Sequence, residues 1–419
     1  MKAKIHPSSC QGCITIPPSK SMAHRALICA SLADGTSVLS NIDYSVDILT
    51  TIDCMRKLGA EIQTLDKKVI VRGISDFDHL IDSHIECNES GSTLRFLIPL
   101  FSLTQQKITF TGKNRLLKRP QKIYEDLFHE KGLTFNQSEE KIEIEGRLPY
   151  GEYSLMGNVS SQFISGLLFT LPLLEKDSIL HILPPFESRS YVDLTLQMMN
   201  KFQVDVHWVD STTLYIKGNQ KYHACDLTVE GDFSQFAFFA VLGAVNSKLS
   251  IAGMDPNSLQ GDRQILDVLK DFQIQVNEQD RIYTIHPSNP TAHDIDLKNC
   301  PDLGPILCTL SMFSEGDTRI THASRLKLKE SDRMLAMQSE CAKMGCVIET
   351  NEDEMIIHGG CHAPLEILSG WKDHRIVMAL AIALTKLGGT IEGCEAITKS
   401  YPGFFEDLKK VGIEVELHD

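Results

Sequence analysis

Long apolar runs are missing from this chain. No stretch of 18 residues is apolar enough to span a membrane, and no basic segment followed by an apolar one opens the chain as in a secretory leader. We therefore expect an unprocessed cytoplasmic protein without a membrane partner.

Positive charge is scarce as well. The 419 residues include 41 lysines and arginines against 55 aspartates and glutamates, which gives a formal net charge of −14. Nucleic-acid binding needs a broad basic face, so this balance argues against a nucleic-acid partner. Local clusters of basic residues are then expected to line pockets.

Cofactor motifs are also missing. No glycine-rich loop followed by Lys-Ser or Lys-Thr occurs, and no Gly-x-Gly-x-x-Gly opens a helix after a strand, which argues against nucleotide cofactors. Cys10-Gln-Gly-Cys13 has the spacing of a metal or redox motif, but no second Cys or His pair matches it. The twelve cysteines are scattered, mostly in apolar helical segments, and are expected to be reduced. The sequence therefore predicts neither a metal nor a cofactor.

What the chain does contain is a repeat. Six apolar helical segments rich in small residues recur with successive gaps of 70, 67, 73, 70 and 70 residues, beginning near Arg25, Arg95, Gln162, Gln235, Pro305 and Arg375. Such helices are expected to be buried on most sides. Amphipathic helices alternate with them and are expected to end near Gly59, Gly132, Phe202, Phe272, Gly345 and Gly412. Each repeat thus combines two helices with three or four short strands, which suits a compact α/β unit.

The length favours two domains, because 419 residues are too many for one hydrophobic core. Six units divide as three and three, and the midpoint falls in segment 222–232. A second crossing is expected near Pro17-Pro18, with the N-terminal strand completing the C-terminal domain. We predict an α/β protein with one domain at 17–228 and a second made of 1–16 plus 229–419.

Polar residues gather where the apolar helices begin. Free backbone N–H groups and the positive end of the helix dipole meet there, so such an end can bind an anion. Taken singly, the serines and aspartates at these starts are equally explained as N-caps worth about 1 kcal/mol. The excess of cations favours binding, because N-caps do not require them. Eight cations flank helix starts: Lys20, Arg25, Arg95, Arg119, Lys329, Arg333, Arg375 and Lys399.

This number of cations indicates two anionic ligands or one highly charged ligand, since a phosphate and a carboxylate each need a cation pair. Asp302 and Glu330 lie among these cations in the sequence. Acids beside anionic ligands are costly unless they move protons. If equivalent helices point their starts at a shared cleft, the ligand bridges the two domains.

Eight segments, in order over essentially the whole chain, resemble the 5-enolpyruvylshikimate-3-phosphate (EPSP) synthase family. They are Pro18-Ser-Lys-Ser-Met-Ala-His-Arg25, Gly91-Ser-Thr-Leu-Arg95, Lys118-Arg-Pro120, Val159-Ser-Ser-Gln-Phe163, Ser188-Arg-Ser-Tyr191, Lys329-Glu-Ser-Asp-Arg333, Asp373-His-Arg375 and Lys399-Ser-Tyr-Pro402. The resemblance implies an enolpyruvyl transferase fold of six βαββαβ-type repeats, three per domain, with the active site in the interdomain cleft.

The same resemblance implies an activity in the shikimate pathway of chorismate and aromatic amino acid biosynthesis. The enolpyruvyl group of phosphoenolpyruvate is transferred to the 5-hydroxyl of shikimate 3-phosphate, and phosphate is released through a tetrahedral intermediate. No metal or other cofactor is needed. We expect the enzyme to be a monomer.

Residue roles follow from the resemblance by position. Shikimate 3-phosphate would be held by Ser21, Arg25, Ser160, Ser161, Gln162, Ser188, Tyr191, Asp302 and Lys329. Phosphoenolpyruvate would be held by Lys20, Gly91, Arg119, Gln162, Arg333, Arg375 and Lys399. Asp302 would accept the proton of the attacking hydroxyl. Glu330 and Lys20 would protonate and later deprotonate the methylene carbon.

Three places depart from the family's usual pattern, one of them Pro18, which stands where glycine often precedes Ser-Lys-Ser. Segment 88–96 replaces the common Gly-Asn-Ala-Gly-Thr-Ala-Met-Arg-Pro and has Phe96 where proline is usual, which leaves sensitivity to the inhibitor glyphosate open. Arg325 stands where some members carry asparagine, and its role is open as well.

Other functions fit the sequence less well, and the negative net charge argues against an RNA 3′-phosphate cyclase, which shares the repeat architecture. A UDP-N-acetylglucosamine enolpyruvyl transferase usually carries a reactive Cys or Asp in the loop before an Arg-Pro pair, and segment 111–120 has neither. A non-catalytic sensor of shikimate 3-phosphate should lose its proton-transfer residues first, yet Asp302, Glu330 and Lys20 are all present. The UDP-N-acetylglucosamine transferase and the sensor are therefore disfavoured.

Overall fold

The computed structural model describes residues 1–74 and 76–418, which form two compact units. The continuous unit runs from Lys20 to Val229. The two-segment unit combines Met1–Ser19 with Glu230–Asp419. The chain thus changes units after residues 19 and 229, whereas the sequence predicted changes after 16 and 228.

Six four-stranded sheets share one topology: a parallel pair of strands is followed by two antiparallel pairs. The continuous unit contains β16 (Leu227–Thr228)-β4 (Thr36–Ser40)-β6 (Lys68–Arg72)-β5 (Glu61–Leu65), β7 (His84–Glu86)-β8 (Ile108–Thr111)-β10 (Lys141–Glu145)-β9 (Thr134–Gln137) and β11 (Glu152–Met156)-β12 (Ser178–Leu183)-β14 (Thr213–Ile216)-β13 (Val206–Trp208). The two-segment unit contains β2 (Cys13–Thr15)-β17 (Leu249–Ala252)-β19 (Ile282–Ile285)-β18 (Val276–Gln279), β20 (Ile295–Asp296)-β21 (Asp317–Thr321)-β23 (Met355–His358)-β22 (Ile348–Thr350) and β24 (Leu368–Ser369)-β25 (Gly389–Glu392)-β1 (Lys2–Ile5)-β26 (Val415–His418). The predicted six repeats, three to a unit, are confirmed. A further two-stranded sheet pairs β15 (Tyr222–His223) with β3 (Ala33–Asp34).

The strand pattern explains why one face of each sheet is buried. In β6, Val69 and Val71 are buried and lie opposite Leu39 and Ser37 of β4, while Lys68 at the strand end is exposed. Side chains alternate between the two faces of a strand, so this register puts the branched apolar residues on one side. The helices of the repeat can then cover that side.

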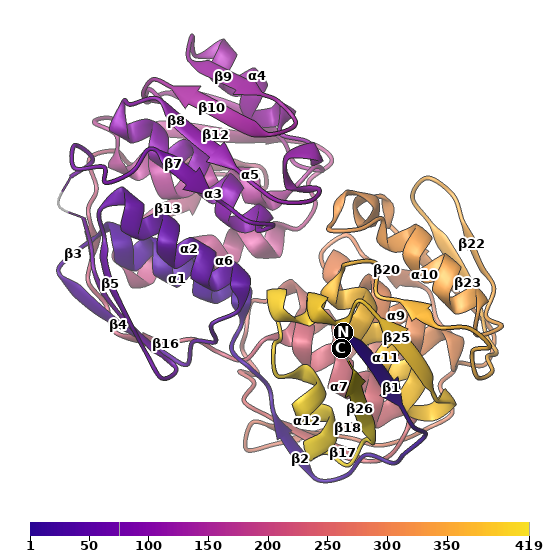
Figure 1. Cartoon of the computed structure of the whole chain (residues 1–419). Helices are drawn as coiled ribbons and strands as arrows, with labels where there is room; N and C mark the ends of the chain where they lie inside the picture. Colours follow the sequence, from indigo (N-terminus) through magenta and orange to yellow (C-terminus); the bar gives the residue numbers. More distant parts are fainter. Residues whose placement is uncertain (75, 419) are drawn as a thin grey trace. The chain divides into compact units, whose positions relative to one another are not determined.

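The N-terminal segment supplies two strands to the two-segment unit. β2 pairs parallel with β17, and β1 lies between β25 and β26, with Ala3 opposite both Ile391 and Leu417. The first and last strands of the chain are therefore neighbours, as Figure 1 shows at the N and C marks. In the continuous unit, β16 has the place beside β4 that β2 has beside β17.

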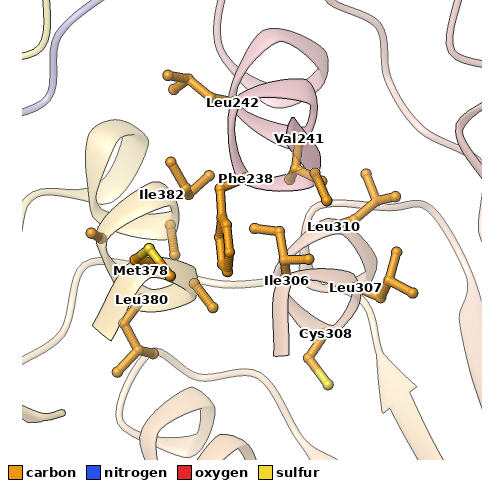
Figure 2. Close-up of a cluster of buried hydrophobic side chains, with 14 of the residues drawn as sticks. Phe238, Val241, Leu242, Ile306, Leu307, Cys308, Leu310, Met378, Leu380 and Ile382 are labelled. Atoms are coloured by element: carbon orange, nitrogen blue, oxygen red, sulfur yellow. The ribbon is translucent and has the colours of Figure 1, made fainter. Parts of the chain in front are cut away.

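Six inner helices are the buried apolar segments predicted from the sequence: α1 (Lys20–Leu32), α3 (Gly91–Phe101), α5 (Ser161–Thr170), α7 (Phe233–Val245), α9 (Gly304–Met312) and α11 (His374–Leu387). All 13 residues of α7 and 12 of the 14 in α11 are buried. Figure 2 shows Phe238 of α7 packed between Ile306 of α9 and Ile382 of α11. The apolar surface on these helices thus forms the core of the two-segment unit.

Six outer helices are amphipathic: α2 (Val46–Leu58), α4 (Lys122–Glu130), α6 (Arg189–Lys201), α8 (Ile265–Asp271), α10 (Arg333–Ala342) and α12 (Phe404–Lys410). α2 ends at Gly59, which has a φ of 117° and donates its N–H to the Arg56 carbonyl oxygen. Residues other than glycine rarely adopt that backbone conformation, so the glycine sets the helix end.

The sequence predicts no membrane-spanning helix and no metal site. Across residues 1–74 and 76–418, no helix has the length and apolarity to cross a membrane. The same residues contain no group of three His, Cys, Asp or Glu side chains placed to hold a metal ion. All twelve cysteines have free thiols and nine are buried; Cys10 is buried and Cys13 exposed.

Close packing of α3 on α5 leads to a stability prediction. A Cβ at Gly166 in α5 would overlap the hydroxyl oxygen of Tyr124 and the carbonyl oxygen of Arg95. We expect Gly166→Ala to lower the free energy of unfolding by about 1–3 kcal/mol, because the helices must separate. Denaturant unfolding measures this loss. Gly403→Ala is the control, because the nearest atom to its Cβ would be Asp407 Oδ2 at 3.9 Å; equal effects would contradict the packing argument.

Candidate functional site

Ten of the predicted site residues lie in the continuous unit: nine are at or near the starts of α1, α3, α5 and α6, and Arg119 lies before α4. We call these ten residues the phosphate cluster, after the ligand predicted for them: Lys20, Ser21 and Arg25 of α1, Gly91 of α3, Arg119 after η2 (Leu116–Lys118), Ser160, Ser161 and Gln162 at the start of α5, and Ser188 and Tyr191 at the start of α6. Ser160 also caps α5 by accepting the Gln162 N–H, so the N-cap interpretation holds for it too.

Arg25 is held by three hydrogen bonds. Its Nε donates to Thr195 Oγ1 at 2.8 Å, its Nη1 to the Ser21 carbonyl oxygen at 2.8 Å, and its Nη2 to the Tyr191 carbonyl oxygen at 3.0 Å. The guanidinium lies over the Phe96 ring, 5.2 Å from its centroid. Burial lowers the pKa of Arg25 to about 10, which leaves it a cation at neutral pH. Of its five N–H groups, two stay available for an anion once these contacts are made.

Gly91, Arg119 and Gln162 lie next to one another. A Cβ at position 91 would be 2.7 Å from Arg119 Nη1 and 3.5 Å from Gln162 Oε1. Arg95 Nη1 donates to Gln162 Oε1 at 2.8 Å, and Gln162 Nε2 donates to Ser92 Oγ at 2.9 Å. Because Gly91 has no side chain, the Arg119 guanidinium can lie against the start of α3. Two arginines and a helix N-terminus therefore gather their positive charge there.

Lys20 and His24 face α2. Lys20 Nζ donates to Asp47 Oδ2 at 2.7 Å. One helical turn further along, His24 Nδ1 is 2.8 Å from Thr51 Oγ1. Burial and the neighbouring cations Lys20 and Arg25 lower the pKa of His24 well below its ordinary value. His24 is therefore neutral, and Asp47 holds the Lys20 ammonium at the start of α1.

The other six predicted site residues lie in the two-segment unit. They form the carboxylate cluster: Asp302 of η5 (Pro301–Leu303), Lys329 and Glu330 between η6 (Ser324–Leu328) and α10, Arg333 of α10, Arg375 of α11, and Lys399 at the end of η7 (Cys394–Lys399).

Arg333 joins three carboxylates and is only 1% exposed. Its Nε donates to Asp373 Oδ2 at 2.8 Å, its Nη1 to Asp302 Oδ1 at 2.9 Å, and its Nη2 to Glu330 Oε2 at 2.8 Å. Nη2 also donates to Asp373 Oδ1 at 3.3 Å. Burial opposes the charge, but the three carboxylates outweigh it and raise the pKa of Arg333. Within residues 1–74 and 76–418, these bonds use four of the five N–H groups and leave one on Nη1.

Asp302 is surrounded by cations. Its Oδ1 accepts from Arg333 and lies 3.1 Å from Lys329 Nζ, and its Oδ2 lies 3.3 Å from Arg375 Nη2. Burial raises the pKa of Asp302, but Arg375, Lys329 and Arg333 outweigh burial and hold it well below the ordinary value. The carboxylate is 21% exposed, so it is both ionised and reachable. An anion that draws Lys329 or Arg375 away would make it a stronger base.

Lys399 and Arg325 lie at the edge of this cluster. Lys399 Nζ donates to the Lys372 carbonyl oxygen at 2.8 Å, in the turn before α11. Arg325, whose role the sequence left open, is buried and donates to the carbonyl oxygens of Lys298 at 2.7 Å and Leu297 at 3.3 Å. Arg325 thus braces the backbone that leads into η5.

Three acids near these residues were given no role from the sequence. Asp47 forms an ion pair with Lys20. Asp373 forms an ion pair with Arg333 and also caps α11 by accepting the Arg375 N–H. Asp262, in η4 (Gly261–Gln264), is buried and accepts a hydrogen bond from the Ser234 hydroxyl. Asp373 had a signal, since it precedes an apolar helix. Asp47 and Asp262 had none, because each looks like an ordinary surface acid in the sequence.

The two clusters suit different chemistry. The phosphate cluster combines hydroxyl groups, arginines and helix N-termini, which together bind phosphate or carboxylate groups. The carboxylate cluster places ionised acids beside cations, which suits proton transfer next to a bound anion.

Comparisons with known proteins place the chain among its relatives. A family model described as EPSP synthase (3-phosphoshikimate 1-carboxyvinyltransferase) matches residues 5–408. The chain is 43% identical over 416 residues to the 3-phosphoshikimate 1-carboxyvinyltransferase of Clostridium kluyveri, which covers 98% of this chain and 97% of that protein. The enzyme of the same name from Clostridium perfringens is also 43% identical over 416 residues, covering 98% of both chains.

Solved structures agree with these sequence matches. The structure of EPSP synthase from Acinetobacter baumannii has a TM-score of 0.81 at 25% identity and covers 99% of this chain and 100% of that chain. The enolpyruvyl transferase NikO from Streptomyces tendae has a TM-score of 0.78 at 16% identity, over 99% and 98% of the two chains, which is a likeness of fold alone.

Proposed function

Because the chain belongs to the EPSP synthase family and so transfers the enolpyruvyl group of phosphoenolpyruvate to shikimate 3-phosphate, we propose that its two clusters hold these substrates and carry out the transfer. The attacking group is the 5-hydroxyl of shikimate 3-phosphate, and phosphate leaves through a tetrahedral intermediate. The ionised Asp302 amid three cations is the observation that carries this proposal.

Shikimate 3-phosphate binds mainly to the phosphate cluster in this proposal. The two remaining N–H groups of Arg25 and the hydroxyls of Ser21, Ser160, Ser161 and Ser188 bind its phosphate. Gln162 and Tyr191 contact the ring, and Asp302 and Lys329 contact its hydroxyl groups. The geometry of Arg25 supports this binding mode. Its three hydrogen bonds fix the side chain, so that it does not form an ion pair with a carboxylate of its own unit.

Phosphoenolpyruvate binds to Lys20, Arg119, Arg333, Arg375 and Lys399, with Gly91 and Gln162 beside it. The adjacency of Gly91, Arg119 and Gln162 supports this set. Arg333 contributes through its one remaining N–H, so its chief role is to hold Asp302, Glu330 and Asp373 in place. Arg375 and Lys329 exchange contacts with Asp302 for contacts with the incoming anions.

Three groups move protons. Asp302 accepts the proton of the attacking hydroxyl, and its basicity increases when the anions engage Lys329 and Arg375. Glu330 and Lys20 protonate the methylene carbon and later remove a proton from it. Cations that hold two like-charged substrates together also stabilise the departing phosphate.

Release of phosphate from phosphoenolpyruvate tests the proposal. The purified protein is assayed without added metal, with shikimate 3-phosphate in one tube and UDP-N-acetylglucosamine in another. We expect release with shikimate 3-phosphate only. Release with UDP-N-acetylglucosamine alone would show that the enolpyruvyl group is transferred to that molecule instead. Tight binding of shikimate 3-phosphate without release in either tube would indicate a sensor.

Three further expectations belong to the same proposal. We propose that the chain acts as a monomer in the cytoplasm, with small-molecule partners only. We also propose that the two units are separate domains, which the sequence predicted at 17–228 and at 1–16 plus 229–419. Light scattering and limited proteolysis test these statements.

A further inference from the structure

The turn before α11 contains residues that do not suit its backbone conformation. The Asp373 N–H donates to the Gly370 carbonyl oxygen at 2.9 Å, which closes a four-residue turn. Its two middle residues, Trp371 and Lys372, have φ values of 50° and 53°. Two successive positive φ values are typical of a type I′ turn, which is usually built from asparagine and glycine. Tryptophan and lysine are costly in this conformation, so neighbouring groups must hold the turn.

Glu340 of α10 binds this turn through both of its carboxylate oxygens. The residue is 1% exposed. Its Oε1 accepts the Trp371 indole N–H at 2.8 Å, and its Oε2 accepts the Ser369 backbone N–H at 2.9 Å. Lys343 Nζ also donates to Oε2 at 2.9 Å and balances the buried charge. One buried acid thus holds both the backbone that leads into the turn and a side chain within it.

The Lys372 carbonyl oxygen connects this turn to the carboxylate cluster. Lys399 Nζ donates to it at 2.8 Å, whereas the Lys372 side chain is exposed. A carbonyl oxygen orients an ammonium group but adds no countercharge, so this contact leaves the positive charge of Lys399 to the cluster. The position of Lys399 therefore depends on the backbone of residue 372, and that backbone depends on Glu340.

We propose that Glu340 is a positioning residue for Lys399: it holds the 370–373 turn in its left-handed conformation, and the turn holds the Lys399 ammonium where it can bind the incoming anion. The inference rests on the proposed function, in which Lys399 binds phosphoenolpyruvate. A disturbed turn should therefore raise the KM for phosphoenolpyruvate. The KM for shikimate 3-phosphate should not change, because the residues proposed to bind that substrate lie on other elements.

Two substitutions at the exposed position 372 test the role of the backbone. Lys372→Gly and Lys372→Val both remove the side-chain charge, but glycine adopts a φ of 53° without strain and valine does not. We expect KM for phosphoenolpyruvate to be about three- to tenfold higher in Lys372→Val than in Lys372→Gly, the equivalent of one ordinary hydrogen bond. KM for shikimate 3-phosphate should be the same in both variants.

A double-mutant cycle shows whether this effect depends on Lys399. The ammonium is already absent in Lys399→Met, so adding Lys372→Val to that variant should give the same KM for phosphoenolpyruvate as adding Lys372→Gly. An equal ratio of the two KM values with and without Lys399 would overturn the inference.

Variants of the acid and of its indole partner test the first step. Glu340→Gln keeps the size of the side chain but leaves one acceptor oxygen where two are used, and Trp371→Phe removes the N–H donor. Each should raise KM for phosphoenolpyruvate as Lys372→Val does, and Trp371→Phe serves as the test if Glu340→Gln does not fold. Glu349→Gln is the control, because the Glu349 side chain in β22 is 67% exposed, and it should match the wild type.

Two failures can be told apart in these measurements. A wild-type KM for phosphoenolpyruvate in the folded variants of Glu340 and Trp371 would overturn the inference alone. A wild-type KM in Lys399→Met would instead refute the proposed role of Lys399, on which the inference rests.

Discussion

Replacing Arg333 with methionine is expected to lower the free energy of unfolding by about 3–5 kcal/mol and to abolish turnover, because a buried ion pair that loses one partner leaves uncompensated charge. Here three carboxylates, those of Asp373, Asp302 and Glu330, lose their shared guanidinium. Methionine fills a similar apolar volume but donates no hydrogen bond. Denaturant unfolding at neutral pH measures the loss.

The loss of stability on acidification should be smaller in this variant. In the wild type, arginine neighbours hold the pKa values of Asp302 and Asp373 below the ordinary 3.8, although burial acts in the opposite direction. These acids therefore stabilise the fold above that pH, and the stability is lost as the pH falls through their folded pKa values. Without Arg333, burial dominates at Asp373, so acidification should relieve the destabilisation there, whereas Asp302 keeps Arg375 and Lys329 beside it.

Arg319→Met is the matched control. Arg319 of β21 pairs with Glu354, and its side chain is 52% exposed. An exposed pair contributes about 0–1 kcal/mol, so this variant should remain close to the wild type in stability and turnover. If Arg333→Met were as stable as Arg319→Met, the three carboxylates would not depend on Arg333.

Asp302→Asn is expected to reduce kcat by about 10²- to 10⁴-fold, the range contributed by a general base. The amide oxygen can still accept hydrogen bonds from Arg333 and Lys329, but the side chain can no longer accept a proton at neutral pH. Binding of shikimate 3-phosphate should persist, because the phosphate cluster is untouched. Phosphate release gives kcat, and calorimetric titration with shikimate 3-phosphate gives Kd.

Asp317→Asn removes an acid of the same kind from β21, where Asp317 pairs with His358 and its side chain is 63% exposed. Its turnover should match that of the wild type. A wild-type rate in Asp302→Asn would remove Asp302 from its role as base. Loss of shikimate 3-phosphate binding together with the rate would make it a binding residue only.

The fold was predictable because its pattern is carried by local sequence. An apolar helix such as α7, with Ala237, Ala240 and Ala244 among aromatic residues, can only be buried, and its recurrence every 70 residues or so indicates repeats. We expected from the sequence that the N-terminal strand completes the C-terminal domain, but the place of β1 between β25 and β26 depends on pairing with distant segments that no local pattern contains.

The contacts between site residues were harder to predict than the residues themselves. Glu330 and Arg333 are only three residues apart, so their ion pair is local in the sequence, although Glu330 lies just before α10. Asp373 is 40 residues from Arg333 and reaches it only through packing between α10 and α11. Arg333 was predicted to bind phosphoenolpyruvate, but the number of carboxylates it already binds depends on tertiary contacts that no local pattern contains.

Product analysis by NMR is the most direct test of enolpyruvyl transfer. The wild-type protein is incubated with shikimate 3-phosphate and phosphoenolpyruvate labelled with ¹³C at the enol carbon. We predict that the label appears as an enol ether carbon bonded to the 5-oxygen of shikimate 3-phosphate, in step with phosphate release. Label recovered as pyruvate, with shikimate 3-phosphate unchanged, would contradict transfer.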